Sequence, residues 1–432
     1  MNQLSIRFLI VGAIVLSMLI PLLFVGGVAG ERQRYYQEAV QAIASSWGGN
    51  QTITGPLLIV PVLKRYTEQS KSGDLIQRHQ RYERVVTPAS LNIETSLTHQ
   101  YRHRAIYEVP VYQADVKVSG TFTDIGISEL QGKFDEVVWN EAILVVGIQS
   151  TQAISQVSSL TWEANVLPFE AGIDNEWLGA GIHVALPDNA ATATVAFEFE
   201  LALKGTNSFA VVPVGAQSSM TVRSTWPHPS FQGQFLPDRY EVRDDGFDAD
   251  WTIHELARNL PSTWIVGATQ TNLQATRAGV VLHDPVSQYH VIERGIKYGV
   301  LFVALTFLTF VCFELTTTIR FHYVQYGVVG AGLILFYLTL LSLSEHMSFL
   351  LAYILATGTL TGLISWYVHS MVRLRNLTLA ITLILLSLYA VLYILLKLEA
   401  FSLLAGTSVL LIGLAALMYV TRGLSERVDE AE

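Results

Sequence analysis

The sequence predicts an integral membrane protein, with a large, mostly antiparallel β extracytoplasmic domain and a helical transmembrane bundle. Three observations support this fold class. The 432 residues are 51% apolar and only 15% charged, whereas soluble proteins carry about 25% charged residues. The charges are unevenly placed, since 48 of the 63 lie in residues 31–295. That region alternates apolar and polar residues, and long apolar runs flank it.

This distribution excludes several classes of protein. A wholly soluble, fibrous or disordered chain would not concentrate its apolar residues in uninterrupted runs. An outer-membrane barrel is excluded too, because its strands alternate in hydrophobicity instead of staying apolar for twenty residues.

The bundle is predicted to contain one N-terminal span and five C-terminal spans. A spanning helix needs about 20 predominantly apolar residues. Six stretches qualify: residues 8–28, 297–313, 323–343, 349–368, 377–396 and 401–420. The predicted organisation is an N-terminal transmembrane anchor (1–30), an extracytoplasmic β-rich domain (31–295), a five-helix transmembrane bundle (296–420) and a cytoplasmic tail (421–432).

Basic residues beside the spans predict the orientation. With the N-terminus in the cytoplasm, the inner positions carry Arg7, Arg320, Arg373, Arg375, Arg422 and Arg427. The short outer loops carry only Lys397. By the positive-inside rule, both termini are cytoplasmic and residues 31–295 lie outside.

The first span has a second interpretation. Arg7, an apolar run and the small residues Ala29 and Gly30 are also typical of a signal peptide. The run is longer than the usual 7–15 residues, and residues 31–46 continue as a plausible helix. These features favour an uncleaved anchor.

Strand patterns fill the middle region. Residues 192–204 alternate to give one apolar face, and six further segments resemble them: 57–63, 81–86, 105–118, 137–148, 209–214 and 220–226. Residues 124–131 and 251–259 are the helix candidates. The one cysteine, Cys312, lies in the second span, so the domain has no disulfide.

The domain gives no sign of an enzyme. It carries 19 basic and 29 acidic residues, a balance that argues against nucleic acid as a partner. The sequence has no phosphate-binding glycine loop, no nucleophile elbow and no complete zinc-peptidase motif. We therefore predict no catalytic residues, no metal site and no cofactor. The lipid bilayer is one partner and an envelope lipid or protein another, and the oligomeric state stays open.

Two histidine patterns are candidate sites in the domain. His99 and His103 are four apart, but their surroundings read as a strand, which favours a solvated face over a metal site. In Trp226-Pro-His-Pro-Ser-Phe231, two prolines hold His228 on a stiff loop. Trp226 and His228 are therefore binding candidates, with a structural corner between strands as the alternative.

The transmembrane part offers two further candidates. Glu345 and His346 lie at the outer end of the third span, where they could bind a cation, relay protons or dock the domain. An ordinary polar turn is the alternative. The pattern Gly358-x-x-x-Gly362 and the glycines near Gly330 are typical of close helix packing, within or between chains.

These features together resemble a known family. The most specific strings are Trp226-Pro-His-Pro-Ser-Phe231 and Leu343-Ser-Glu-His346. Three weaker ones are Gly55-Pro56 followed by Val60-Pro61-Val62, the run 297–307, and Leu404-Ala-Gly-Thr-Ser408. With the order of one span, a β-rich domain and five spans, the chain resembles the CreD family of inner membrane proteins.

The resemblance implies a Gram-negative inner membrane protein linked to envelope integrity. Members are associated with a two-component system that responds to cell-wall stress and β-lactams, and with tolerance to colicins. No enzymatic activity, ligand or catalytic residue comes with the family. The main hypothesis is a non-enzymatic protein whose periplasmic domain senses or binds an envelope component. The alternatives are a lipid or small-molecule transporter that uses the bundle and, third, a membrane-embedded hydrolase.

Overall fold

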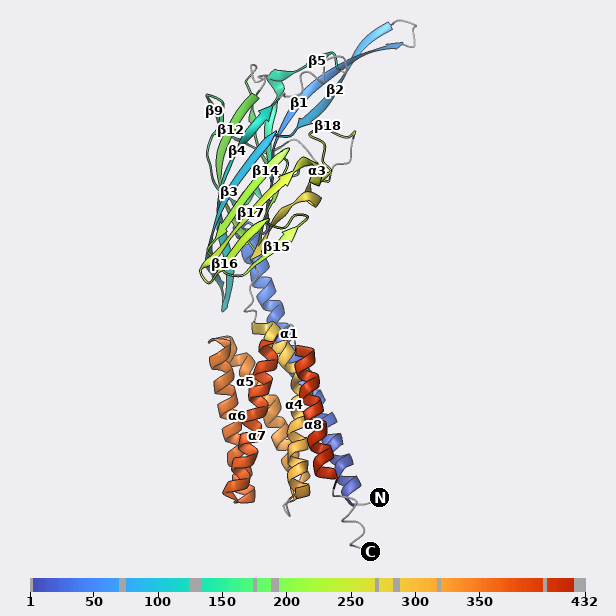
Figure 1. Ribbon diagram of the computed structural model, residues 1–432, viewed down its shortest axis with the longest axis vertical. Coiled ribbons are helices and arrows are strands. Elements are labelled where there is room, and N and C mark those ends of the chain that lie inside the picture. Colours follow the sequence, from blue (N-terminus) through green and yellow to red (C-terminus); the bar gives the residue numbers. More distant parts are fainter. Residues whose placement is uncertain are drawn as a thin grey trace. The chain divides into compact units, whose positions relative to one another are not determined.

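The computed structural model describes residues 3–69, 75–123, 134–173, 177–187, 194–268, 272–282, 288–316, 320–398 and 402–422 (Figure 1). The chain forms two compact units. The β unit is Glu38–Pro285, and the helical unit combines Met1–Gln37 with Val286–Glu432.

Helices form at all six predicted positions. They are α1 (Gln3–Trp47), α4 (Gln288–Thr316), α5 (Tyr323–Ser344), α6 (Phe349–Val372), α7 (Arg375–Lys397) and α8 (Ser402–Thr421). Within the described residues, α1 and α4 to α7 are long and apolar enough to cross a membrane. In α8 the corresponding apolar stretch is shorter, Leu404–Ala415. The sixth span therefore stays a prediction.

The helical unit has a core of large side chains. Helix α4 contacts α5, α7 and α8, and α6 contacts α5 and α7 (Figure 1). Phe307, Phe336, Tyr337 and Tyr389 are at most 1% exposed in this core. The outer faces carry exposed leucines, an arrangement that suits a hydrocarbon surrounding and would be costly in water.

Helix α1 packs one side against this core. Leu22 and Val25 are buried. A Cβ atom built on Gly299 of α4 would lie 3.0 Å from the Leu22 side chain, so the two helices approach closely here. Glycine permits this approach because it has no side chain to separate the backbones.

The β unit contains two sheets among the described residues. The first sheet has ten strands, with the order β10-β11-β6-β1-β13-β19-β15 and with β2, β5 and β18 attached beside β1 and β2. Its strands are β1 (Gln51–Gln69), β2 (Leu75–Val86), β5 (Glu136–Val137), β6 (Ile143–Ile148), β10 (Glu170–Ala171), β11 (Gly181–Ala185), β13 (Ser208–Val212), β15 (Pro229–Gly233), β18 (Thr263–Ile265) and β19 (Ala278–Leu282).

The second sheet has nine strands, with the order β16-β17-β14-β3-β4-β12-β8-β9 and with β7 paired to β12. Its strands are β3 (Ser90–Arg104), β4 (Tyr107–Thr123), β7 (Ile154–Val157), β8 (Leu160–Trp162), β9 (Asn165–Leu167), β12 (Thr194–Thr206), β14 (Gln217–Ser224), β16 (Arg239–Arg243) and β17 (Gly246–His254). Most pairs are antiparallel; β1 with β13 and β14 with β3 are parallel. The predicted β-rich domain is confirmed.

Alternation in the sequence determines which side chains enter the core of the β unit. Along β12, Val195, Phe197, Phe199 and Leu201 are at most 2% exposed, and the residues between them are exposed or half-buried. Successive strand residues point to opposite faces. One apolar face from each sheet therefore contributes to a single core.

Some predicted elements differ from the structure. The predicted helix at 251–259 is wrong for its first half, because Trp251 lies in β17 and only α3 (Glu255–Arg258) is helical. Phe247, Ala249, Trp251 and Ile253 are buried at every second position, a strand period that outweighs local helix propensity. The helix candidate 124–131 lies outside the described residues.

The predicted strand at 137–148 is interrupted. A short 3₁₀ turn, η1 (Trp139–Glu141), separates β5 from β6. Two more such turns are η2 (Thr151–Ala153) and η3 (Leu273–Thr276).

The last turns of α1 belong to the β unit. Ile43 packs with Val109 and Val111 of β4. Trp47 Nε1 donates to the carbonyl oxygen of Tyr112 at 3.3 Å, and the Arg102 guanidinium lies 4.2 Å from the Trp47 ring centroid. This end of α1 is therefore attached by apolar packing, a hydrogen bond and a cation–π contact.

Candidate functional site

The predicted loop around Trp226 forms an aromatic cluster in the β unit. Strand β14 ends at Ser224, opposite Leu97 of the parallel strand β3. This register places Thr225 and Trp226 beside the next residues of β3, so that His99 Nδ1 lies 2.6 Å from Thr225 Oγ1. The backbone N–H of His99 also donates to that hydroxyl at 3.2 Å.

Three rings surround the indole of Trp226. The ring centroid of His99 lies 5.4 Å away, that of Tyr101 6.4 Å and that of His228 6.5 Å. Trp226 itself is only 4% exposed, whereas Tyr101 is 50% exposed and His228 is exposed. We call Trp226, His99, Tyr101 and His228 the Trp226 cluster. A buried indole thus supports a surface of one phenol and two imidazoles.

The cluster combines the two interpretations of the Trp-Pro-His-Pro loop. The burial of Trp226 in the main core matches a structural corner between β14 and β15. The exposed rings beside it provide flat apolar faces with polar edges, the surface that ordered aromatic residues offer to a ligand. The binding role of Trp226 and His228 stays a prediction.

His103 is separate from the cluster. It lies in β3, as the predicted strand requires, and pairs across the ladder with Glu108. Its Nε2 atom is 3.5 Å from the Glu108 carboxylate, and both side chains are more than 60% exposed. Within the described residues, no three His, Cys, Asp or Glu side chains form a group that could hold a metal ion.

Glu345 has a partner that the sequence did not indicate. It caps the C-terminus of α5, and its Oε1 atom lies 3.6 Å from Nε of Arg32 in α1. The Glu345 side chain is 11% exposed and that of Arg32 is 44% exposed. A carboxylate this buried is stable when a cation neutralises it. The ion pair therefore connects α1 to α5.

His346 does not share this contact. It is exposed, and its backbone N–H donates to the carbonyl oxygen of Leu343 in the turn that ends α5. The structure thus shows Glu345 in an interhelical ion pair and His346 in a polar turn. Their predicted binding roles remain untested.

A second ion pair connects α1 to α4. Arg7 Nη1 lies 3.6 Å from Oε2 of Glu314, whose side chain is 12% exposed. The other oxygen of Glu314 accepts a 2.5 Å hydrogen bond from the backbone N–H of Phe321. Arg7 also donates to the Phe321 carbonyl oxygen at 3.4 Å. These contacts join the start of α1, the end of α4 and the segment before α5.

The two ion pairs are separated by roughly the thickness of a bilayer. Arg7 and Arg32 are 25 residues apart in one helix, which corresponds to roughly 37 Å at 1.5 Å per residue. The hydrocarbon layer is about 30 Å thick. Arg7 and Glu345 stand out in the sequence, but their partners, Glu314 and Arg32, do not. The available signal was two arginines at this spacing in one apolar helix.

Arg258 is a further residue that the sequence did not indicate. It is 2% exposed, and its guanidinium nitrogens have no hydrogen-bond partner among the described residues. Burial lowers the pKa of Arg258, and the nearby Glu255 partly opposes this shift. An uncompensated buried charge reduces stability, so the rest of the β core must offset it.

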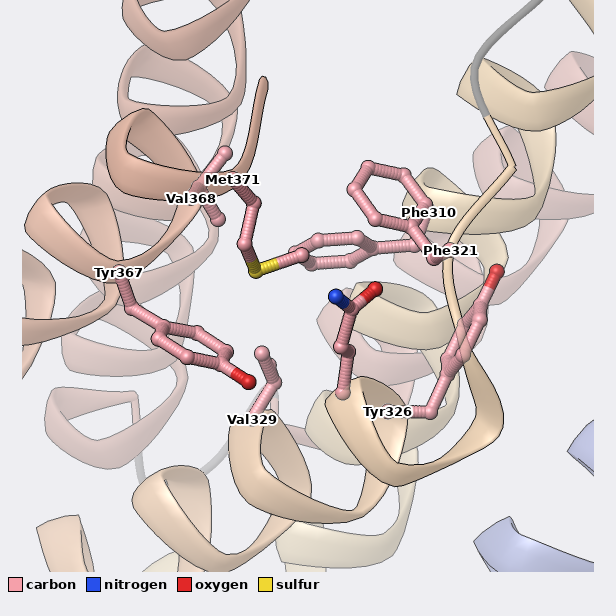
Figure 2. A pocket seen from close by; sticks show the side chains of 8 residues that line it. Phe310, Phe321, Tyr326, Val329, Tyr367, Val368 and Met371 are labelled. Carbon is pink, nitrogen blue, oxygen red and sulfur yellow. The ribbon is translucent and has the colours of Figure 1, made fainter. Parts of the chain in front are cut away.

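A small cavity and a larger groove lie among the described residues of the helical unit. Figure 2 shows the cavity, where Phe310, Phe321, Tyr367 and Met371 converge; its volume is about 10 Å³, too small for more than a water molecule. The groove has a volume of about 480 Å³. Leucines, isoleucines and valines of α4, α7 and α8 line it, together with Thr309, Cys312 and Ser387.

The glycine patterns differ in their packing. A Cβ atom built on Gly358 or Gly362 would have no other atom within 4 Å, so this pattern does not pack against the rest of the helical unit. One built on Gly330 would lie 2.9 Å from Met18 of α1. Close packing within the chain is therefore found at Gly330.

A family model and a curated relative both indicate the same family. The family model described as inner membrane protein CreD matches residues 3–425. The inner membrane protein CreD of Escherichia coli (strain K12) is 34% identical over 411 residues, 95% of this chain and 91% of that protein.

The similarity to solved structures is weak. A point mutant of an M1 zinc metallopeptidase from Deinococcus radiodurans matches 45% of this chain and 41% of its own, with 10% identity and a TM-score of 0.21. Another structure of an M1 zinc metallopeptidase from that organism gives 9% identity and a TM-score of 0.19 over 38% of each chain. No functional argument follows from similarity at this level.

Proposed function

Because the chain belongs to the CreD family of inner membrane proteins, we propose that it is a non-enzymatic, multi-pass protein that supports envelope integrity. In this proposal the β unit lies in the periplasm and binds or senses an envelope component. The helical unit anchors the β unit in the membrane. The protein takes part in the response of the cell to cell-wall stress.

The Trp226 cluster is the observation that carries the binding role. It has exposed aromatic and imidazole rings held on a buried indole, so little conformational freedom is lost when a ligand docks. A recognition surface is therefore the better interpretation of this cluster.

Replacing the exposed rings tests the binding role. In an Escherichia coli strain without its own CreD relative, this chain is expected to support growth under a sublethal β-lactam. Tyr101→Ala together with His228→Ala should reduce survival to the level of the empty strain at equal protein abundance. Tyr66→Ala, at an exposed tyrosine of β1, is the matched control and should change nothing. Full survival of the strain with the double variant would contradict the proposal. So would an enzymatic activity that the wild-type protein has and the double variant lacks.

Two observations support an uncleaved N-terminal helix with both ends of the chain in the cytoplasm. The ion pairs Arg7–Glu314 and Arg32–Glu345 hold α1 against α4 and α5 at two positions far apart along the helix. The basic residues beside the spans predict the same orientation.

Labelling of introduced cysteines tests the orientation. In a Cys312→Ser background, Leu256→Cys lies at a 92% exposed position of the β unit, and Asn376→Cys lies at the exposed start of α7. An impermeant thiol reagent added to spheroplasts is expected to label residue 256 and to leave residue 376 unlabelled until the membrane is permeabilised. The reverse pattern would refute the orientation.

A lipid or small-molecule transporter is the second candidate function. The groove between α4, α7 and α8 favours it, because its apolar lining and volume of about 480 Å³ suit an acyl chain. The pairing of Glu345 with Arg32 weighs against an ion-coupled version, because the carboxylate is already neutralised. The envelope role therefore remains the main proposal.

A further inference from the structure

We propose that the β unit binds a single sugar-acid unit, that is, a hydroxyl-rich ring that carries a carboxylate, in a polar hollow beside Arg277. The hollow lies in the ten-stranded sheet, apart from the Trp226 cluster. This inference deepens the proposed function by naming a ligand class, and it rests on the β unit being a binding domain.

The hollow has a volume of about 180 Å³. Its lining comes from strands of the ten-stranded sheet and the residues beside their ends, among them Asn50, Thr52, Gln149, Ala210, Gln232 and Arg277. Pockets for drug-sized ligands usually have volumes of about 300 Å³ or more, so this smaller space suits one small ring.

Strand register explains the floor of the hollow. Thr52 pairs with Ala210, which pairs with Gly279, which pairs with Gln232. The neighbouring residues Phe209 and Val280 are at most 1% exposed and belong to the core. Because strand residues alternate, Ala210 and Gly279 point to the opposite face of the sheet.

The glycine in this row is there for a physical reason. A Cβ atom on Gly279 would lie 2.4 Å from the Phe209 carbonyl oxygen and 2.6 Å from Ala210 Cα, so no larger residue fits. The longer side chains of Gln149 and Gln232 flank this low floor, one on each side. The result is a trough across β1, β13, β19 and β15.

The walls suit a ligand with several hydroxyl groups. Thr52 Oγ1 donates to Gln149 Oε1 at 3.0 Å, and Asn207 Nδ2 donates to Asn50 Oδ1 at 3.2 Å. These bonds orient the amides and occupy one lone pair of each acceptor. The NH₂ groups of Gln149 and Asn50 remain as donors, because they make no hydrogen bond to the described residues. Amides that both donate and accept match hydroxyls, which do the same.

Arg277 supplies the charge selectivity. Among the described residues it is the one cation in the lining, which contains no carboxylate. Its exposed side chain makes no ion pair within the described part of the chain. Residues 31–295 carry ten more acidic than basic residues, so an isolated guanidinium beside amides is a local exception. Its planar donor pair fits a carboxylate.

Direct binding to the purified full-length protein in nanodiscs tests the inference. The probes are glucuronate, glucose and inorganic phosphate, measured by titration with saturation-transfer NMR. Glucuronate is expected to bind about tenfold more tightly than glucose, since one charge-assisted hydrogen bond is worth about that factor. Phosphate should bind more weakly than glucuronate, because it accepts from the amide NH₂ groups but lacks the ring of hydroxyls that would donate to the amide oxygens and fill the hollow.

Variants locate the site. Arg277→Gln should reduce glucuronate binding to the level of glucose, and Arg277→Lys should keep part of the difference. Ala210→Leu should fill the hollow and remove binding of both sugars. The matched control Arg239→Gln makes the same charge change at an exposed position of β16 in the other sheet and should have no effect.

Two outcomes would overturn the inference. One is equal glucuronate affinity for wild type and Arg277→Gln, which places the ligand elsewhere. The other is phosphate binding as tight as glucuronate binding, which indicates an anion site without sugar selectivity. Neither outcome changes the survival of the Tyr101→Ala, His228→Ala variant, so failure here is distinguishable from failure of the proposed function.

Discussion

Replacing Gly330 with leucine is expected to displace α1 from the helical unit and to lower the free energy of unfolding by about 1–3 kcal/mol, the usual cost of overpacking. The physical reason is a lack of space. A Cβ atom at Gly330 would lie 2.9 Å from the Met18 sulfur and 2.9 Å from the Phe307 ring. Leucine adds three more carbons in that direction, and the aromatic ring of Phe307 is fully buried and cannot move away.

Gly327 provides a matched control in the same helix. A Cβ atom there would meet no other atom within 4 Å. Gly327→Leu should therefore leave the free energy of unfolding unchanged or raise it slightly. Leucine stabilises a helix by up to about 1 kcal/mol relative to glycine. Thermal unfolding of both variants in one detergent measures the difference. Equal melting temperatures would show that α1 does not pack at Gly330.

This comparison also tests whether the first span is retained. Met18 lies within the segment that a signal peptidase would remove. If the span were cleaved, Gly330→Leu would meet Phe307 but no longer Met18, and the effect would shrink. The intact mass of the purified protein decides between the two cases independently.

Removing the carboxylate of Glu314 is the second large effect that we expect. Glu314→Ala should lower the free energy of unfolding by about 2 kcal/mol, because it leaves the Arg7 guanidinium without its counter-charge and the Phe321 N–H without its acceptor. The 12% exposure of the Glu314 side chain limits how far water can replace it.

A graded set of variants separates charge from hydrogen bonding. Glu314→Gln keeps an oxygen for the Phe321 N–H and loses only the charge, so its effect should be smaller. Arg7→Ala combined with Glu314→Ala should be less destabilising than the sum of the single variants, as expected for partners.

An exposed ion pair serves as the control. Glu293 and Lys297 lie one turn apart in α4, with side chains 46% and 69% exposed. Such pairs contribute about 0.5 kcal/mol or less, so Glu293→Gln should barely change the melting temperature. An effect of Glu314→Ala as small as that of Glu293→Gln would show that the Arg7–Glu314 pair does not hold α1.

Only part of each candidate site could be predicted from the local sequence. The Trp226 loop was recognisable because two prolines restrict the backbone around His228. Its association with His99 and Tyr101 was not, because residues more than 120 positions apart meet only through the parallel pairing of β14 with β3. The spacing of His99 and His103 would suit a ligand pair on a helix, but the strand pattern favours a solvated face, and in β3 each histidine contacts a different partner.

The helix prediction at 251–259 failed for a related reason. Trp251 and Ile253 fit either a short helix or a strand when taken alone. Pairing with β14 selects the strand, because it satisfies the backbone hydrogen bonds and buries every second side chain. Local preference is a small energy compared with the packing of a core strand.

Local patterns in the chain were enough to divide it into a nearly uncharged helical part and an alternating, acidic β part, and to place the six helices. These features follow from periodicity and from the cost of burying charge, which each segment shows independently. The pairing of Arg7 and Arg32 with Glu314 and Glu345 emerged only from the folded chain. So did the floor that Ala210 and Gly279 form beside Arg277. Such contacts depend on helix packing and strand register between distant segments, which no local pattern contains.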